Sequence, residues 1–113
     1  MAAELDQTFA ALSDPTRRAV IALLAQEPLR SSDLATALST SRPSMSRHLR
    51  VLRHAGIVDE ETLRDDARSR VYHLRQQPFS ELRAWLAEME AFWGDQLLAF
   101  KAHAERKSAR PKP

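Results

Sequence analysis

The chain has 113 residues, of which 43% are hydrophobic, and a formal net charge of +2. This length fits one domain, and the absence of cysteine excludes disulfides, thiol redox sensing and thiolate metal sites. The longest apolar run, Ala19 to Ala25, is too short to span a membrane, and the acidic start AAELDQ does not resemble a signal peptide. We therefore expect a soluble cytoplasmic protein with no membrane partner. One domain is expected over residues 1–107, followed by a disordered tail over 108–113 that has two prolines and nothing to bury.

Basic residues are distributed unevenly. Residues 101–113 carry a net charge of +4, whereas residues 1–100 hold 12 basic and 14 acidic side chains and so carry −2. Between Asp33 and Asp59, however, there are four arginines and no acidic residue. This local concentration, rather than the overall pI, indicates a surface that attracts phosphates. The basic tail is either a second contact or a solubilising end.

Two helices are predicted at the start of the chain. Residues 4–12 form the first, and its apolar face carries Leu5, Phe9 and Leu12. Asp14 caps the second, which has Pro15 at its first position and runs to about Gln26. The inward-facing residues of the second helix are Val20, Leu23 and Leu24.

Residues 31–58 indicate two short helices joined by a tight turn. Ser31 or Ser32 caps the first helix, which ends by Ser39, and the second starts close to residue 42 and stops at Gly56. The apolar positions expected to be buried are Leu34, Ala35 and Leu38 in the first helix and Met45, Leu49 and Leu52 in the second. The second helix carries Arg47, Arg50 and His54 on roughly the opposite face. This is the layout of a helix-turn-helix that reads DNA.

A β-hairpin is expected after the second of these helices. Residues 57–63 and 69–74 suggest two strands around a polar loop, which together form a wing. The wing arginines expected to reach phosphates or the minor groove are Arg64, Arg68 and Arg70. Asp65 and Asp66 weaken that interpretation because they would lie near the DNA charge.

The last predicted helix, from Phe79 to about His103, has more apolar surface than a small domain can cover. Pairing with a second copy is the simplest way to bury it. The predicted dimer interface consists of Leu5, Phe9, Leu12, Leu82, Leu86, Met89, Trp93, Leu97 and Phe100. The alternatives are a monomer whose two ends fold back on the core, and a small-molecule pocket lined by Trp85, Phe92 and Trp93.

Three segments, ALSDPTRRAVIALL, SRPSMSRHLRVLRHAGIV and RSRVYHL, resemble the ArsR (arsenic-repressor-type) family of bacterial winged helix-turn-helix regulators. The resemblance covers residues 5–75 by motif and extends to about residue 100 by architecture. It implies a mainly α fold with a small β-hairpin, in which four helices, two strands and a fifth helix follow in order and the terminal helices dimerise. Ser39 departs from the family because such turns often carry glycine.

The resemblance also implies which residues meet DNA. It places Arg42, Ser44, Ser46, Arg47 and His48 near the exposed start of the recognition helix. Arg47 is the best candidate to read a base, since a guanidinium makes two hydrogen bonds to guanine, worth about 1–3 kcal/mol of discrimination. Phosphate contacts are expected from Arg50, Ser31 and Ser32. His48 either touches DNA or is a half-buried packing residue, and His54 is expected to stabilise the helix dipole.

Metal ligands and catalytic groups are not expected. Many relatives release DNA on binding a metal through cysteines in the first helix of the turn motif or through ligand pairs on the last helix. The corresponding first helix here, SSDLATALS, has no cysteine. On the last helix, the only histidine is His103, and Glu88, Glu90 and Asp95 do not have the spacing expected of metal ligands. A site shared across subunits is the remaining metal alternative. The two glycines, Gly56 and Gly94, exclude a phosphate-binding glycine loop, and the histidines have structural explanations. We expect no cofactor and no enzyme activity.

The sequence as a whole predicts a homodimeric transcriptional regulator that binds a palindromic operator in double-stranded DNA. Its half-sites would lie about 34 Å apart or a multiple of that distance. Repression, rather than activation, is what the family resemblance implies, and an effector molecule is left open. The alternative is a winged-helix interaction module that titrates another regulator through its aromatic last helix without binding DNA.

Overall fold

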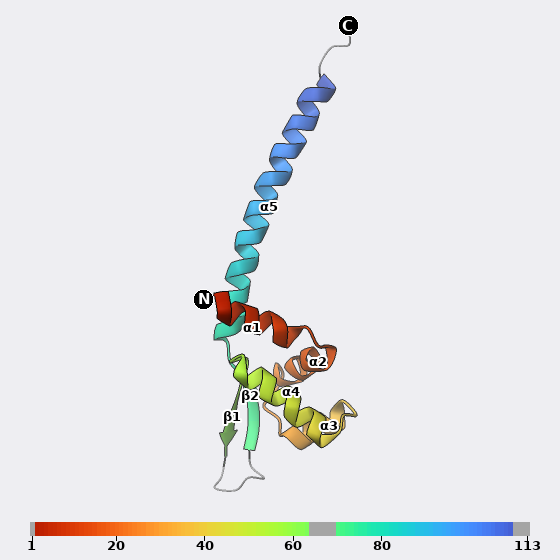
Figure 1. Ribbon diagram of the computed structural model, residues 1–113, viewed down its shortest axis with the longest axis vertical. Helices are drawn as coiled ribbons and strands as arrows, with labels where there is room; N and C mark the ends of the chain where they lie inside the picture. The colour runs from red at the N-terminus through yellow and green to blue at the C-terminus, as the bar shows by residue number, and fades with distance from the viewer. Residues whose placement is uncertain (1, 64–69, 110–113) are drawn as a thin grey trace. The chain divides into compact units, whose positions relative to one another are not determined.

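The computed structural model describes residues 2–63 and 70–109, in two compact units, Met1–Glu81 and Leu82–Pro113. Figure 1 shows the elements in the predicted order of a winged helix-turn-helix, mainly α with a small hairpin. They are α1 (Ala2–Leu12), α2 (Pro15–Leu24), α3 (Ser31–Ala37), α4 (Arg42–His54), β1 (Val58–Thr62), β2 (Arg70–Leu74) and α5 (Gln77–Ala109).

The junction between α1 and α2 is held by the segment Asp-Pro-Thr-Arg-Arg. As predicted, Asp14 caps α2: its Oδ1 accepts hydrogen bonds from the N–H of Thr16 at 2.8 Å and of Arg17 at 3.1 Å. These bonds, chiefly the one from Arg17, hold the pKa of the Asp14 carboxyl below its usual value.

The two arginines of that segment point back to the preceding helix. Arg17 donates from Nε to the carbonyl of Ala11 at 2.7 Å and from Nη2 to that of Ala10 at 3.2 Å. Arg18 donates from Nη1 to the carbonyl of Leu12 at 2.6 Å. The last carbonyls of a helix lack partners within it and carry its negative dipole end, so these guanidinium groups satisfy and stabilise the end of α1.

The turn between α3 and α4 contains a left-handed residue. Ser39 has φ of +52°, and its N–H bonds to the carbonyl of Thr36 while the N–H of Thr40 bonds to that of Ala35. This is a Schellman motif, whose left-handed position usually carries glycine. Ser39, which stands where turns of the ArsR family often carry glycine, is therefore the one strained position of this turn.

The caps of the two helices differ in how well they match the prediction. Ser41 caps α4, accepting the Ser44 N–H at 3.3 Å, and Pro43 lies in the first turn. The capping of α3 by Ser31 or Ser32 was wrong: the cap position is Arg30, without a side-chain cap bond, because the helix already begins at Ser31.

The end of α4 repeats the same geometry with glycine. Gly56 has φ of +75°, its N–H bonds to the carbonyl of Arg53 at 2.9 Å, and the N–H of Ile57 bonds to that of Leu52 at 3.0 Å. A Cβ added at Gly56 would lie 3.7 Å from Nη1 of Arg75, an ordinary contact. The backbone angle, rather than space, is what requires glycine here.

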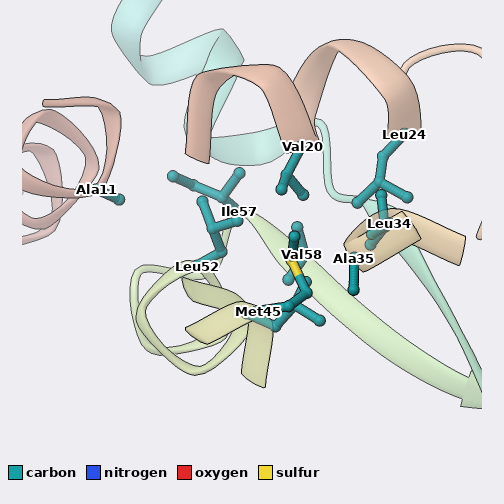
Figure 2. Packing of buried hydrophobic residues seen from close by; sticks show 10 residues of the cluster. Ala11, Val20, Leu24, Leu34, Ala35, Met45, Leu52, Ile57 and Val58 are labelled. Atoms are coloured by element: carbon teal, nitrogen blue, oxygen red, sulfur yellow. The ribbon is translucent and has the colours of Figure 1, made fainter. Parts of the chain in front are cut away.

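The core lies where α1, α2, α3, α4 and the start of β1 meet. Figure 2 shows the side chains of Val20, Leu52, Met45 and Val58 pointing toward one another. The buried apolar residues are Ala11, Val20, Leu24, Leu34, Ala35, Met45, Leu49, Leu52, Ile57 and Val58. This confirms the apolar stripes predicted for α2, α3 and α4, although Leu23 and Leu38 are only partly buried against the core.

Strands β1 and β2 form the predicted antiparallel hairpin, with Val58 paired to Leu74 and Thr62 to Arg70. Leu29 adds a bridge that the sequence did not indicate. Its N–H bonds to the carbonyl of Tyr72 at 3.2 Å, and the Tyr72 N–H bonds back at 2.8 Å. The segment before α3 is thereby tied to the base of the wing.

Helix α5 is longer than predicted, beginning at Gln77 and ending at Ala109. Its first turn belongs to the first unit, where Phe79 packs against the core. In the second unit large apolar side chains are exposed: Leu86 at 46%, Phe92 at 52%, Trp93 at 59%, Leu97 at 64%, Leu98 at 66% and Phe100 at 71%. The helix includes Ser108 and Ala109 of the expected tail, and residues 110–113 lie outside the described part.

Candidate nucleic-acid interface

Two adjoining hollows lie on the outer side of α4 in the first unit. One has a volume of about 390 Å³ and is lined by Ser46, Arg50, Arg53, His54, Glu60, Arg70 and Tyr72. The other has a volume of about 510 Å³ and is lined by Arg30, Ser31, Ser32, Arg42, Ser46, Arg70 and Tyr72. Ser46, Arg70 and Tyr72 line both hollows, which therefore adjoin, and we call the two together the α4 groove.

The α4 groove is lined by residues of α3, α4, β1 and β2 and by Arg30, which precedes α3. The start of α3, the exposed face of α4 and strand β2 contribute six of the residues predicted to bind DNA: Ser31, Ser32, Arg42, Ser46, Arg50 and Arg70. The predicted residues Ser44, Arg47 and His48 lie on α4 but do not line these two hollows. Arg64 and Arg68 lie outside the described residues.

The charge of the groove is strongly positive. Its described lining holds five arginines, namely Arg30, Arg42, Arg50, Arg53 and Arg70, and one carboxylate, Glu60. Arg42 and Arg50 are exposed, and the burial of Met45 and Leu49 on the other side of α4 fixes which face they occupy. A concave basic surface of this kind attracts and orients a polyanion.

Arg47 lies on α4 with its guanidinium exposed. Its contact within the chain is a hydrogen bond from Nη2 to Oγ of Ser44 at 3.2 Å. One hydrogen bond between an exposed neutral group and an exposed charged group contributes little to stability, so the guanidinium is available to an external acceptor.

The groove also contains an ion-pair cluster that the sequence did not reveal. Oε1 of Glu60 accepts from Nη1 of Arg53 at 3.0 Å, and Oε2 lies 3.7 Å from Nε of Arg70. Burial, followed by the neighbouring Glu60 carboxylate, raises the pKa of the Tyr72 hydroxyl above its usual value. The alternation of β1 places Glu60 on the face of the buried Val58, but its partners depend on strand register, which the residue pattern does not fix.

His48 contacts the junction between α1 and α2. Its Nδ1 lies 3.4 Å from Nη1 of Arg17, the same guanidinium that bonds to the end of α1. Arginine only donates, so a hydrogen bond between these two atoms requires Nδ1 as the acceptor and the ring hydrogen on Nε2. His48 is half-buried, which agrees with the predicted alternative of a packing residue. Its contact with DNA, through Nε2, stays a prediction.

Neither a metal cluster nor a membrane-spanning helix is found in the described part. No group of three or more histidine, aspartate or glutamate side chains in residues 2–63 and 70–109 is arranged to hold a metal ion. Within the same ranges, no helix is both long and apolar enough to cross a bilayer.

Comparison with known sequences identifies similar proteins. A family model described as a helix-turn-helix domain matches residues 12–61. The HTH-type transcriptional regulator Rv2034 of Mycobacterium tuberculosis is 39% identical over 88 residues, which cover 78% of this chain and 77% of that protein. The arsenical resistance operon repressor of Escherichia coli is 37% identical over 84 residues, or 74% of this chain and 66% of the relative. The transcriptional repressor SdpR of Bacillus subtilis is 36% identical over 56 residues, or 50% of this chain and 62% of the relative.

Solved structures share the fold over most of this chain. An ArsR-like transcriptional regulator from Rhodococcus sp. RHA1 superposes with a TM-score of 0.79 at 33% identity, covering 92% of this chain and 93% of that one. The crystal structure of an ArsR family transcriptional regulator, RHA00566, gives a TM-score of 0.72 at 34% identity, covering 80% and 97%. The similarity thus extends beyond the helix-turn-helix itself.

Proposed function

Because the chain belongs to the ArsR family of winged helix-turn-helix DNA-binding transcriptional regulators, we propose that it is a homodimeric repressor that binds a palindromic operator through residues 42–50 of α4, the α4 groove and the wing. The resemblance drawn from its sequence motifs is confirmed by this membership. The family consists of transcription regulators and not of enzymes.

The observation that carries the proposed DNA contact is the convergence of arginines from separate elements on the α4 groove. A duplex presents phosphates on both sides of its major groove, so a reading helix needs basic groups flanking it. In this proposal Arg50, Ser31 and Ser32 contact phosphates at the two sides of α4, and Arg70 contacts the backbone from β2.

The start of α4 reads the bases in this proposal. Arg47 makes the base contact, since its exposed guanidinium can bond to O6 and N7 of a guanine. The remaining proposed contacts of the helix are Arg42, Ser44, Ser46 and His48. Arg64 and Arg68 remain predicted wing contacts from outside the described residues.

Repression is supported by two relatives whose names state it, the arsenical resistance operon repressor and SdpR. A response to metals through thiolates is not proposed, since the chain has no cysteine.

The homodimer is supported by the apolar stripe of α5. Its members are the predicted residues Leu82, Leu86, Met89, Trp93, Leu97 and Phe100, and four of them are between 46% and 71% exposed. A contiguous row of large exposed apolar side chains marks an interaction surface, and a second copy of α5 offers the same stripe in return. On α1, Leu5, Phe9 and Leu12 are proposed to contact the second copy as well, with Phe9 38% exposed.

The proposal is tested with DNA selected from a random pool and with the variant Arg47→Ala. We expect the variant to lose about 1–3 kcal/mol of operator affinity while its oligomeric state and thermal unfolding stay unchanged. The matched control is Arg83→Ala, which removes the same charge from an exposed position on α5.

The interaction-module alternative predicts a different result. If selection enriches no sequence and Arg47→Ala behaves as the wild type does with DNA, the regulator proposal is refuted, and the exposed aromatic residues of α5 become the functional surface.

A further inference from the structure

Glu60 is the acidic residue among the described lining of a groove that otherwise gathers arginines. A carboxylate facing a proposed phosphate-binding surface opposes binding, because it repels DNA and neutralises the groups that attract it. Its presence there calls for a function that compensates for the lost affinity.

The geometry shows what this carboxylate does in the free protein. Its two oxygens face two different guanidinium groups, Arg53 at 3.0 Å and Arg70 at 3.7 Å, and those side chains are each 48% exposed. Glu60 itself is only 22% exposed, so it is held in place by the fold while the arginines reach into solvent. The arginines can therefore exchange partners without movement of the strand.

The bonding of Glu60 to Arg70 is also incomplete. Within the described residues the buried Oε2 makes no hydrogen bond to Arg70, because the 3.7 Å distance exceeds that of a hydrogen bond, while burial, followed by the Glu60 charge and its hydrogen bond with the Tyr72 hydroxyl, raises the pKa of Tyr72. The pairing of Glu60 with Arg70 in the free protein is therefore weaker than a hydrogen-bonded or bidentate pair would be.

We propose that Glu60 acts as an internal substitute for a DNA phosphate, occupying Arg53 and Arg70 until DNA displaces it, and so limits binding that depends on phosphate contacts alone. The inference rests on the proposed DNA contact of the α4 groove. Non-specific binding depends almost entirely on phosphate contacts, so the competing carboxylate weakens it directly. The carboxylate opposes the phosphate contacts of an operator by the same amount, but an operator adds base contacts that keep its binding strong.

The test compares Glu60→Gln, which keeps the shape and removes the charge, with Glu61→Gln, which removes an exposed charge one residue further along β1. Affinities for the selected operator and for a random-sequence duplex are measured at several salt concentrations. For Glu60→Gln we expect random-duplex affinity to rise about tenfold, operator affinity to rise by a similar factor, and the salt dependence to steepen by about one to two phosphate contacts.

A double variant tests whether the rise in random-duplex affinity comes from the release of Arg53. Adding Arg53→Gln to Glu60→Gln should return the random-duplex affinity close to that of the wild type, because the released guanidinium is then absent. The single tyrosine of the chain, Tyr72, reports the charge change: its ionisation, followed by absorbance, should shift to lower pH in Glu60→Gln.

Two outcomes would overturn the inference alone. One is a random-duplex affinity of Glu60→Gln equal to that of Glu61→Gln, and the other is weaker binding of both DNAs, which would make Glu60 only a support for the arginines. If the wild type itself does not prefer the operator, or Arg47→Ala retains that preference, the proposed DNA contact has failed and the role of Glu60 fails with it.

Discussion

Helices α4 and α5 both carry a regular apolar stripe, but the two stripes differ in what covers them. On α4, Met45, Leu49 and Leu52 are at most 1% exposed because α1, α2, α3 and β1 surround them. On α5, Trp93 and Phe100 are 59% and 71% exposed, and among the described residues of its own unit, 82–109, that helix has no second element beside it. Periodicity therefore reveals that a face is apolar but not whether the same chain or another molecule covers it.

The largest effect is expected from Leu52→Ala, which tests the covered apolar stripe of α4. Leu52 is fully buried, so its truncation leaves a cavity and should lower the free energy of unfolding by about 3–5 kcal/mol. Chemical denaturation checks this, at a fixed protein concentration because the proposed dimerisation would contribute to stability. A loss below about 1 kcal/mol would show that α4 is not packed as described.

A smaller effect is expected from Leu97→Ala, which acts on the α5 side. The variant should weaken the proposed dimer by about 2 kcal/mol, roughly thirtyfold in dissociation constant, without unfolding the first unit. Sedimentation at a series of protein concentrations measures the dissociation constant.

Leu98→Ala is the matched control for that variant. Leu97 and Leu98 are adjacent and almost equally exposed, at 64% and 66%, but a helix turns about 100° per residue, which puts Leu98 off the stripe. Equal weakening by both variants would argue against an interface along the predicted stripe.

The smallest effect is expected from Ser39→Gly, which changes the turn before α4 and leaves α5 unaltered. Glycine adopts the left-handed conformation of residue 39 without the penalty that serine has, as Gly56 already does at the other end of α4. We expect a gain of about 0.5–1 kcal/mol in the free energy of unfolding and no change in the dimer dissociation constant. A loss of stability would mean that the serine hydroxyl has a stabilising contact in this turn.

Local patterns predicted the parts of the fold that depend on nearby residues. The stripes of α2, α3 and α4, the cap at Asp14 and the stop at Gly56 were readable because each involves neighbours within about one or two helical turns. The six predicted DNA-contact residues that line the α4 groove came instead from the family resemblance and the wing pattern, and their contact with DNA stays a prediction.

Contacts between distant segments were not readable. The bridge of Leu29 to Tyr72 and the cluster around Glu60 require the strand register and the placement of β2 against α4. The end of α5 was placed too early because, after His103, charged and small residues continue a helix without an apolar stripe to mark it.

The Asp-Pro-Thr-Arg-Arg segment has a consequence for how the chain folds. Its hydrogen bonds join residues only two to seven positions apart, so closing them costs little chain entropy. Contacts of such short sequence separation are those that form fastest in folding chains. We expect the corner between α1 and α2 to fold early, so that Arg17 is already fixed when His48 arrives from 31 residues away.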